Sequence, residues 1–132
     1  MDKSVGSVTY TLMLDAAGGV RSDVTVARLA DDVFQVGANG PLDFDWINRH
    51  LPADGSVVLR DITTATCCLG LWGPLARDVL APLTPADLTN DGLRYFRALT
   101  TTVAGGALVA PAASAQGSSN DPAPAFYQPP RS

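Results

Sequence analysis

Alternating apolar and polar positions in the N-terminal third of the chain predict consecutive β-strands. Ser7–Leu14 and Val20–Leu29 are rich in β-branched and aromatic residues, and the paired glycines between them are typical of a hairpin turn. Val33–Gly37 is a further short run of the same kind. Because each turn is short, we expect three antiparallel strands that follow one another in sequence.

The hydrophobic period changes to that of a helix after residue 40. Four large apolar side chains recur at helical spacing between Pro41 and Leu51, and prolines stand at both ends of the run. The expected core-facing positions are Leu42, Trp46, Ile47 and Leu51. Asp43 and Asp45 are acids of the first turns, where they favour the helix dipole and need no catalytic role.

The rest of the first hundred residues predicts a mixture of strands and short helices. Strands are expected at Val57–Asp61, Thr66–Trp72 and Leu93–Leu99, and the second of these is apolar enough to be central in a sheet. A helix is expected from Gly73 to Leu80, with Leu75, Val79 and Leu80 facing the core, and a helix of one or two turns is expected from Thr84-Pro-Ala-Asp87, with Thr84 as its N-cap. The order indicates an α+β fold with a mainly antiparallel sheet and helices packed on one side.

Composition divides the chain into two parts. Residues 1–99 carry nearly all the charges and predict one folded domain, whereas residues 100–132 are rich in Ala, Pro and Ser and predict a disordered tail. Residues 100–110 at the start of this tail have strand character. The length of 132 residues fits a single domain.

Charge and residue usage exclude several classes of function. Nine basic and 13 acidic residues give a net charge of −4, which disfavours binding to a nucleic-acid backbone. No run reaches the ~20 apolar residues of a membrane span. With one histidine, His50, and no glutamate, we expect no metal site, and we expect His50 to contact the carbonyls at its helix end.

The two cysteines indicate a reducing compartment. Cys67 and Cys68 are neighbours, and neighbours in a strand point to opposite faces, so a disulfide between them would be strained. We expect both to be small core residues and the protein to be cytoplasmic.

Asp23 is the acidic side chain that follows the Gly-Gly turn in the predicted hairpin. Strand phase places Val20, Val24 and Val26 on one face and Asp23 on the other. Taken alone, the pattern fits an exposed acid at the start of a strand, and Tyr10 fits a packing aromatic.

A series of short motifs, taken together and in order, resembles the folate-binding domain of the aminomethyltransferase family. This family includes the T-protein of the glycine cleavage system and the C-terminal part of dimethylglycine and sarcosine dehydrogenases and oxidases. The resemblance covers roughly residues 5–97, and its Leu-Trp-Gly-Pro, Asp-Ile-Thr and Tyr-Phe-Arg motifs are closest to the dimethylglycine and sarcosine group. The motifs are Tyr10-Thr-Leu-Met-Leu14, Gly18-Gly-Val-Arg-Ser-Asp23, Val26-Ala-Arg-Leu29, Asp43-Phe-Asp-Trp-Ile47, Asp61-Ile-Thr-Thr64, Leu71-Trp-Gly-Pro74, Ala76-Arg-Asp-Val-Leu80 and Tyr95-Phe-Arg97.

The resemblance implies one-carbon chemistry with tetrahydrofolate as cofactor. In this family an aminomethyl or iminium carbon passes to N5 of tetrahydrofolate beside a carboxylate that follows the Gly-Gly turn. That position is Asp23 here, which the resemblance makes the catalytic residue. The family's aromatic near the pterin falls on Tyr10. A short gap leaves Ala38 or Asn39 as the match for a folate-contacting asparagine, and Asn39 is the candidate because it is the asparagine of the two.

Departures from the family pattern leave alternatives open. The Tyr-x-Gly-Glu segment that follows the Tyr-Phe-Arg strand in relatives is missing, and no G-x-G-x-x-G motif is present, so we expect a truncated domain whose FAD domain is absent. The chain is then a fragment of a folate-dependent aminomethyl-transfer domain, a non-catalytic binding module with the same fold, or an inactive product. A flavoprotein domain and a second copy of the chain are the macromolecular partners left open.

Overall fold

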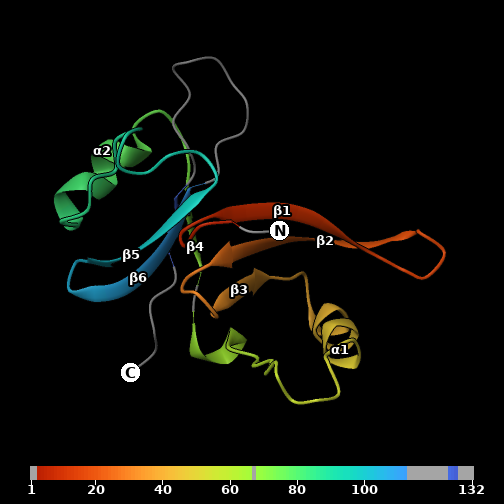
Figure 1. Cartoon of the computed structure of the whole chain (residues 1–132). Coiled ribbons are helices and arrows are strands. Elements are labelled where there is room, and N and C mark those ends of the chain that lie inside the picture. Colours follow the sequence, from red (N-terminus) through yellow and green to blue (C-terminus); the bar gives the residue numbers. More distant parts are fainter. Residues whose placement is uncertain (1–2, 67, 113–124, 128–132) are drawn as a thin grey trace.

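The computed structural model describes residues 3–66, 68–112 and 125–127, which form an α+β fold with two antiparallel sheets. Figure 1 shows a long hairpin at one side of the molecule and a second group of strands at the other. This confirms the expected fold class, with the antiparallel pairing divided between two sheets.

The first sheet has the predicted meander of three strands. β1 (Val8–Leu14) pairs with β2 (Val20–Arg28), which pairs with β3 (Phe34–Gly37), and both pairings are antiparallel. The β1–β2 turn depends on Gly18, whose φ of 86° lies in the left-handed region that glycine adopts without strain. Asp15 closes the turn through Oδ1, which accepts the backbone N–H groups of Ala17 and Gly19.

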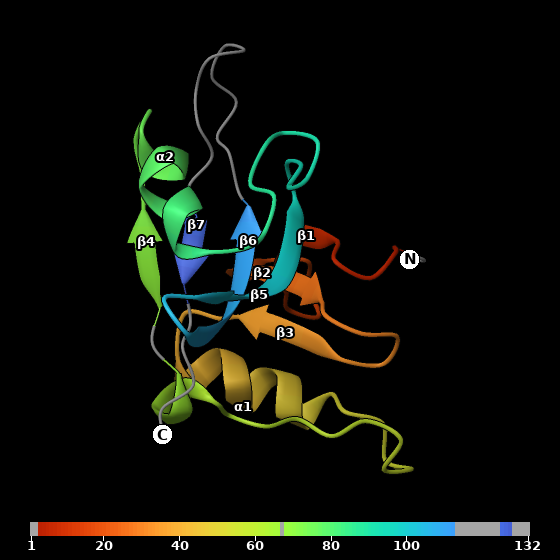
Figure 2. The same cartoon turned by 90° about the vertical axis from the view of Figure 1, so that its left-hand side faces the viewer.

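The second sheet has four strands in the order β4-β7-β6-β5. They are β4 (Leu69–Leu71), β5 (Arg97–Val103), β6 (Gly106–Ala112) and β7 (Ala125–Tyr127). β5 and β6 form a second hairpin, which Figure 2 shows beside the first sheet.

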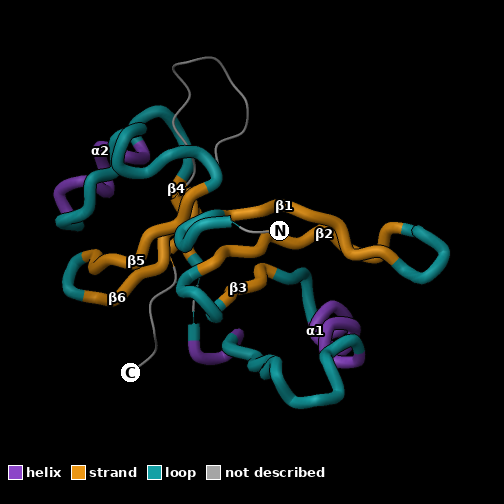
Figure 3. The backbone as a smooth tube through the Cα atoms, viewed as in Figure 1, coloured by secondary structure: helices purple, strands orange, loops and turns teal. Residues whose placement is uncertain are grey.

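Helices are few and short. α1 (Pro41–Arg49) follows β3, with Pro41 in the first turn as expected, and α2 (Ala76–Leu80) follows β4. Single 3-10 turns lie at Thr63–Ala65 and Ala81–Leu83. Figure 3 shows that α1 and α2 lie at opposite ends of the molecule, next to different sheets.

The two sheets are joined where the start of β1 meets the start of β5. Val8, Ala27 and Ala98 are all less than 9% exposed and form one buried cluster, with Leu29 and Phe96 packed against it. Removing these apolar groups from water is the main favourable term at the junction.

Arg97 adds a polar connection at the same junction. Its guanidinium donates hydrogen bonds to the hydroxyls of Ser4 and Ser7 and to the carbonyl of Val5. Gly6 lies between these residues with a φ of 81°, and a Cβ there would stand 2.9 Å from the carbonyl oxygen of Ala98. The N-terminal segment is therefore fixed against both sheets.

Several sequence-based predictions for residues 57–99 are wrong. Val57–Asp61 forms no strand, because Val58 is 74% exposed and Asp61 accepts the N–H of Thr63 to begin a 3-10 turn. Thr84–Asp87 forms no helix, since the Thr84 hydroxyl accepts the N–H of Ala86 in a turn. The last predicted strand begins at Arg97 rather than Leu93, which instead packs with Leu88.

The strand expected at Thr66–Trp72 is shorter than predicted and is not central. The strand comprises Leu69–Leu71 and lies at an edge of its sheet, with Leu69 57% exposed. Cys68 is an exposed free thiol rather than a core residue, and Cys67 lies outside the described residues.

The helices bury only part of the faces that were predicted, since Trp46, Ile47 and Leu51 are partly buried as expected and the other predicted positions differ. Leu42 of α1 is 76% exposed and Asp43 is buried in its place. At α2 Ala76 is buried and Leu75 and Val79 are exposed, whereas Leu80 packs against a core cluster as expected. The fully buried positions of the two helices thus carry a small side chain and a hydrogen-bonded one.

The region predicted as a disordered tail contains strands where the structure describes it. β5 continues to Val103, and residues 106–112 and 125–127 form β6 and β7. Residues 113–124 and 128–132 lie outside the described part, so the boundary at residue 99 stays a prediction. Among the helices of the described residues, none has the length and hydropathy needed to cross a membrane.

Candidate functional site

The structure brings Tyr10, Asp23 and Asn39 together at one place on the first sheet. The Tyr10 hydroxyl donates a hydrogen bond of 2.9 Å to Asp23 Oδ2. The Asn39 side-chain amide lies 3.3 Å from Asp23 Oδ1 and donates a shorter bond of 2.8 Å to the Asp23 backbone carbonyl. Both oxygens of one carboxylate therefore face donors from two other segments.

Strand register explains why Tyr10 reaches Asp23. In the β1–β2 pairing, Tyr10 lies opposite Thr25 and Leu12 lies opposite Asp23. Residues directly opposite in an antiparallel pair share a face, so Tyr10 and Asp23 are diagonal neighbours on that face. A long aromatic side chain spans such a diagonal, which places its hydroxyl at the carboxylate.

Asn39 reaches the same point because it lies between the end of β3 and the start of α1. Asp43 is the third residue of α1, and its Oδ2 accepts the backbone N–H of Asn39 at 2.9 Å. An acid at this helix position commonly accepts an N–H that precedes the helix. This contact fixes the backbone from which the Asn39 amide extends to β2.

Two further residues belong to the site, and the sequence analysis did not assign them to it. The Ser22 hydroxyl donates to Asp43 Oδ2 at 2.8 Å and lies 3.0 Å from the Asn39 side-chain nitrogen. Asp43 is only 9% exposed. In the sequence, Asp43 was marked only by its place in the first helical turn, and a favourable interaction with the helix dipole explains an acid there equally well. Nothing in the sequence indicated Ser22 apart from its position before Asp23.

The site is open to solvent rather than enclosed. Asp23 and Asn39 are exposed, and Tyr10 is 55% exposed. The valine face predicted for β2 is only partly buried, since Val24 is 4% exposed but Val20 is 65% exposed near the hairpin tip. A ligand can therefore approach the carboxylate directly.

The hydrogen bond to Asp23 raises the pKa of the Tyr10 phenol above its ordinary value. Desolvation and the negative charge of Asp23 act in the same direction. Because the folded-state pKa is raised, this contribution to stability is fully present below the ordinary phenol pKa and is lost as the pH rises through the raised value.

Replacing Asp23 with alanine is expected to lower the pKa of Tyr10 toward that of a free tyrosine, because the acceptor and the charge both disappear. Ultraviolet absorbance of tyrosinate against pH measures this change, and the Tyr10→Phe variant isolates the signal of Tyr10 from those of the other two tyrosines. An unchanged Tyr10 titration in Asp23→Ala would contradict the observed contact.

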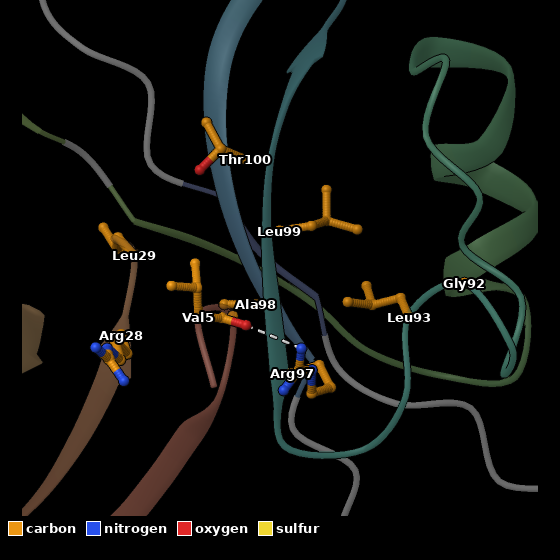
Figure 4. A pocket seen from close by; sticks show the side chains of 10 residues that line it. Val5, Arg28, Leu29, Gly92, Leu93, Arg97, Ala98, Leu99 and Thr100 are labelled. Carbon is orange, nitrogen blue, oxygen red and sulfur yellow. Dashed lines mark hydrogen bonds between the residues drawn. The ribbon is translucent and has the colours of Figure 1, made fainter. Parts of the chain in front are cut away.

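A cavity of about 430 Å³ lies away from these residues, between the N-terminal segment, the end of β2 and the start of β5 (Figure 4). Its walls include Arg28 together with the apolar residues Val5, Leu29, Leu93 and Leu99. Arg97 also lines it, but the Arg97 guanidinium is hydrogen bonded to the carbonyl of Val5, as the dashed line in Figure 4 shows. The cavity and the Asp23 site therefore occupy different parts of the molecule.

The other candidate positions have structural explanations. His50 Nδ1 lies 2.7 Å from the carbonyl oxygen of Trp46, which confirms the expected contact at the helix end. The Trp46 ring lies 4.3 Å from that of His50, and the guanidinium of Arg21, from β2, lies 4.0 Å from the centre of the Trp46 ring. Within the described residues no group of three or more His, Cys, Asp or Glu side chains could hold a metal ion.

Comparison with known sequences shows the family of the chain. The profile of the GCVT N-terminal domain matches residues 1–117, and the chain belongs to that family. The protein is 39% identical over 94 residues to an aminomethyltransferase from Geobacillus thermodenitrificans, an alignment that covers 69% of this chain and 25% of the relative.

One of the similar proteins is a regulatory subunit rather than an aminomethyltransferase. The chain is 36% identical over 96 residues to the mitochondrial pyruvate dehydrogenase phosphatase regulatory subunit of Mus musculus, which covers 69% of this chain and 11% of that protein. An aminomethyltransferase from Anoxybacillus flavithermus is 39% identical over 94 residues, with 69% and 25% covered. The chain thus spans a quarter or less of the length of these relatives.

Proposed function

We propose that the chain binds tetrahydrofolate at Tyr10, Asp23 and Asn39, and that Asp23 serves as the catalytic carboxylate of an aminomethyl-transfer domain. The observation that supports this most strongly is the convergence of the three side chains on one exposed face. These residues are 13 and 16 positions apart in sequence, and only the strand pairing and the β3–α1 connection bring them together.

The residues present fit a reduced pterin. An ionised carboxylate has about four acceptor positions, and the contacts with Tyr10 and Asn39 use two of them. The remaining positions can accept N–H groups, of which the pterin ring carries several. The half-exposed Tyr10 ring offers an aromatic surface beside them.

Each residue has a distinct role in this proposal. Asp23 orients the ligand through charge-assisted hydrogen bonds, and its carboxylate stabilises positive charge that develops next to it. Tyr10 and Asn39 restrain the two carboxylate oxygens, so that less rotational freedom is lost when the ligand binds. Tetrahydrofolate, when bound, supplies the amine that accepts the one-carbon unit.

We further propose that the domain comes from a protein of the dimethylglycine and sarcosine oxidoreductase type. The motifs at residues 61–63, 71–74 and 95–97 support this branch of the family. In that type of protein FAD belongs to a separate domain, so the flavin would be held by a flavoprotein partner or domain and not by these residues.

Calorimetric titration with tetrahydrofolate under anaerobic conditions tests the proposal. We expect binding to the wild-type chain and at least a tenfold loss of affinity in Asp23→Asn, because about 1.5–3 kcal/mol is typical of a hydrogen bond to a charged group. The matched control is Asp31→Asn, which makes the same change of charge at a side chain that is 95% exposed.

The possible outcomes separate the three alternatives. Binding that Asp23→Asn weakens and Asp31→Asn does not supports the proposal. A cooperative thermal melt without folate binding supports a non-catalytic module and contradicts the proposal. Absence of a cooperative melt supports an inactive product.

A further inference from the structure

We propose that Asp43 is a positioning residue for Asp23, acting through Ser22 and Asn39. This inference rests on the proposed function, since it assigns a supporting role at the same site. Asp43 Oδ2 accepts hydrogen bonds from the Ser22 hydroxyl and from the backbone N–H of Asn39, the residue whose side-chain amide binds Asp23.

Because Asp43 is buried, its carboxylate depends on the hydrogen bonds that it accepts. A carboxylate that is only 9% exposed is costly unless its oxygens are hydrogen bonded. Asp43 Oδ2 accepts two bonds, one from the Ser22 hydroxyl at 2.8 Å and one from the Asn39 N–H at 2.9 Å. One buried oxygen thus holds β2 and the start of α1 together, directly behind Asp23.

The acceptor character of Asp43 also sets the direction of the hydrogen bonds. Ser22 has one hydroxyl proton, and a carboxylate can only accept, so that proton points to Asp43. The Ser22 oxygen is then left to accept from the Asn39 side-chain nitrogen at 3.0 Å. This selects the amide orientation of Asn39 in which nitrogen, and not oxygen, faces Asp23.

The consequence for Asp23 is a fixed donor at Oδ1. With the amide reversed, the oxygen of Asn39 would face the carboxylate and repel it. Without the bond from Asp43 to the Asn39 backbone, the amide would lose its anchor. In either case the carboxylate would have more freedom in the absence of ligand, and binding would have to restrict it.

Two variants break the hydrogen bonds that link Asp43 to Asp23, each at a different residue. Asp43→Ala removes the shared acceptor, and Ser22→Ala removes the intermediate hydroxyl while leaving α1 unaltered. Asp43→Asn is the conservative variant, because its amide oxygen can accept both bonds. Asp45→Asn is the control, since Asp45 is a neighbouring acid of the same helix with a surface ion pair to Arg49.

Two measurements separate this inference from the folate proposal. Proton exchange of the Asn39 side-chain amide, measured by NMR, needs no ligand, and we expect it to be about tenfold faster in Asp43→Ala and Ser22→Ala. Tetrahydrofolate affinity should fall about tenfold in the same variants. Asp43→Asn should restore both quantities to within about threefold of wild type, and Asp45→Asn should leave both unchanged.

Thermal melts first establish which variants are folded, and Ser22→Ala carries the test if Asp43→Ala does not fold. Unchanged amide exchange in a folded Ser22→Ala or Asp43→Ala variant overturns the inference. Faster exchange with unaltered folate affinity, in a chain whose wild type binds folate, also overturns it. If the wild type does not bind folate, the folate proposal fails, while faster exchange still supports the role of Asp43 in holding Asn39.

Discussion

Replacing Val8 with aspartate is expected to unfold the chain. Val8 is 2% exposed and packs with Ala27 and Ala98 in the cluster that joins the two sheets. Its backbone N–H also donates to the carbonyl of Phe96 at 2.8 Å. A carboxylate at this point would lack a partner in an apolar environment, and such a charge costs about 3–5 kcal/mol. That is a large fraction of the ~5–15 kcal/mol that stabilises a typical domain.

Circular dichroism during thermal unfolding measures the effect. The matched control is Val20→Asp, in the same hairpin, where the side chain is 65% exposed. We expect the Val20 variant to melt as the wild type does and the Val8 variant to show no cooperative transition. Equal melting of the two variants would mean that this junction is not the core of the protein.

Replacing Arg97 with methionine is expected to lower the free energy of unfolding by about 2–3 kcal/mol, since it removes several hydrogen bonds from a charged donor. The three acceptors are the hydroxyls of Ser4 and Ser7 and the carbonyl of Val5. Methionine keeps most of the aliphatic stem, so the loss reports on the guanidinium rather than on packing.

Urea denaturation gives the free energies for this comparison. Arg94→Met is the control, because Arg94 is exposed and its substitution removes the same charge three residues earlier in the chain. Equal stability of the two variants would show that the contacts of Arg97 with the N-terminal segment contribute nothing.

The N-terminal half of the fold could be predicted because its structure is decided by neighbours in sequence. The meander β1–β3 joins consecutive strands through short turns, and the turn chemistry of Asp15 and Gly18 is visible in the sequence. The same pairing register placed Tyr10 beside Asp23. The family resemblance singled out these residues, and the register accounts for their contact.

The C-terminal half depends on contacts between distant residues, and its prediction largely failed. β4 pairs with β7, more than fifty residues later in the chain, and a local apolar pattern cannot indicate whether its strand is central or at an edge. Periodicity assigned Leu75 to a core that it does not join, and Val58 is exposed in a segment that was predicted to be a strand. Similarly, the burial of Asp43 follows from a tertiary contact with Ser22, which helix propensity does not reveal.

NMR titration of the isotope-labelled chain with tetrahydrofolate tests the central claim most directly, because it locates the ligand as well as detecting it. The account predicts that the largest saturable chemical-shift changes fall on Tyr10, Asp23 and Asn39. Changes confined to Leu93 and Leu99, in the separate cavity, or the absence of any saturable change in a folded chain, would contradict it.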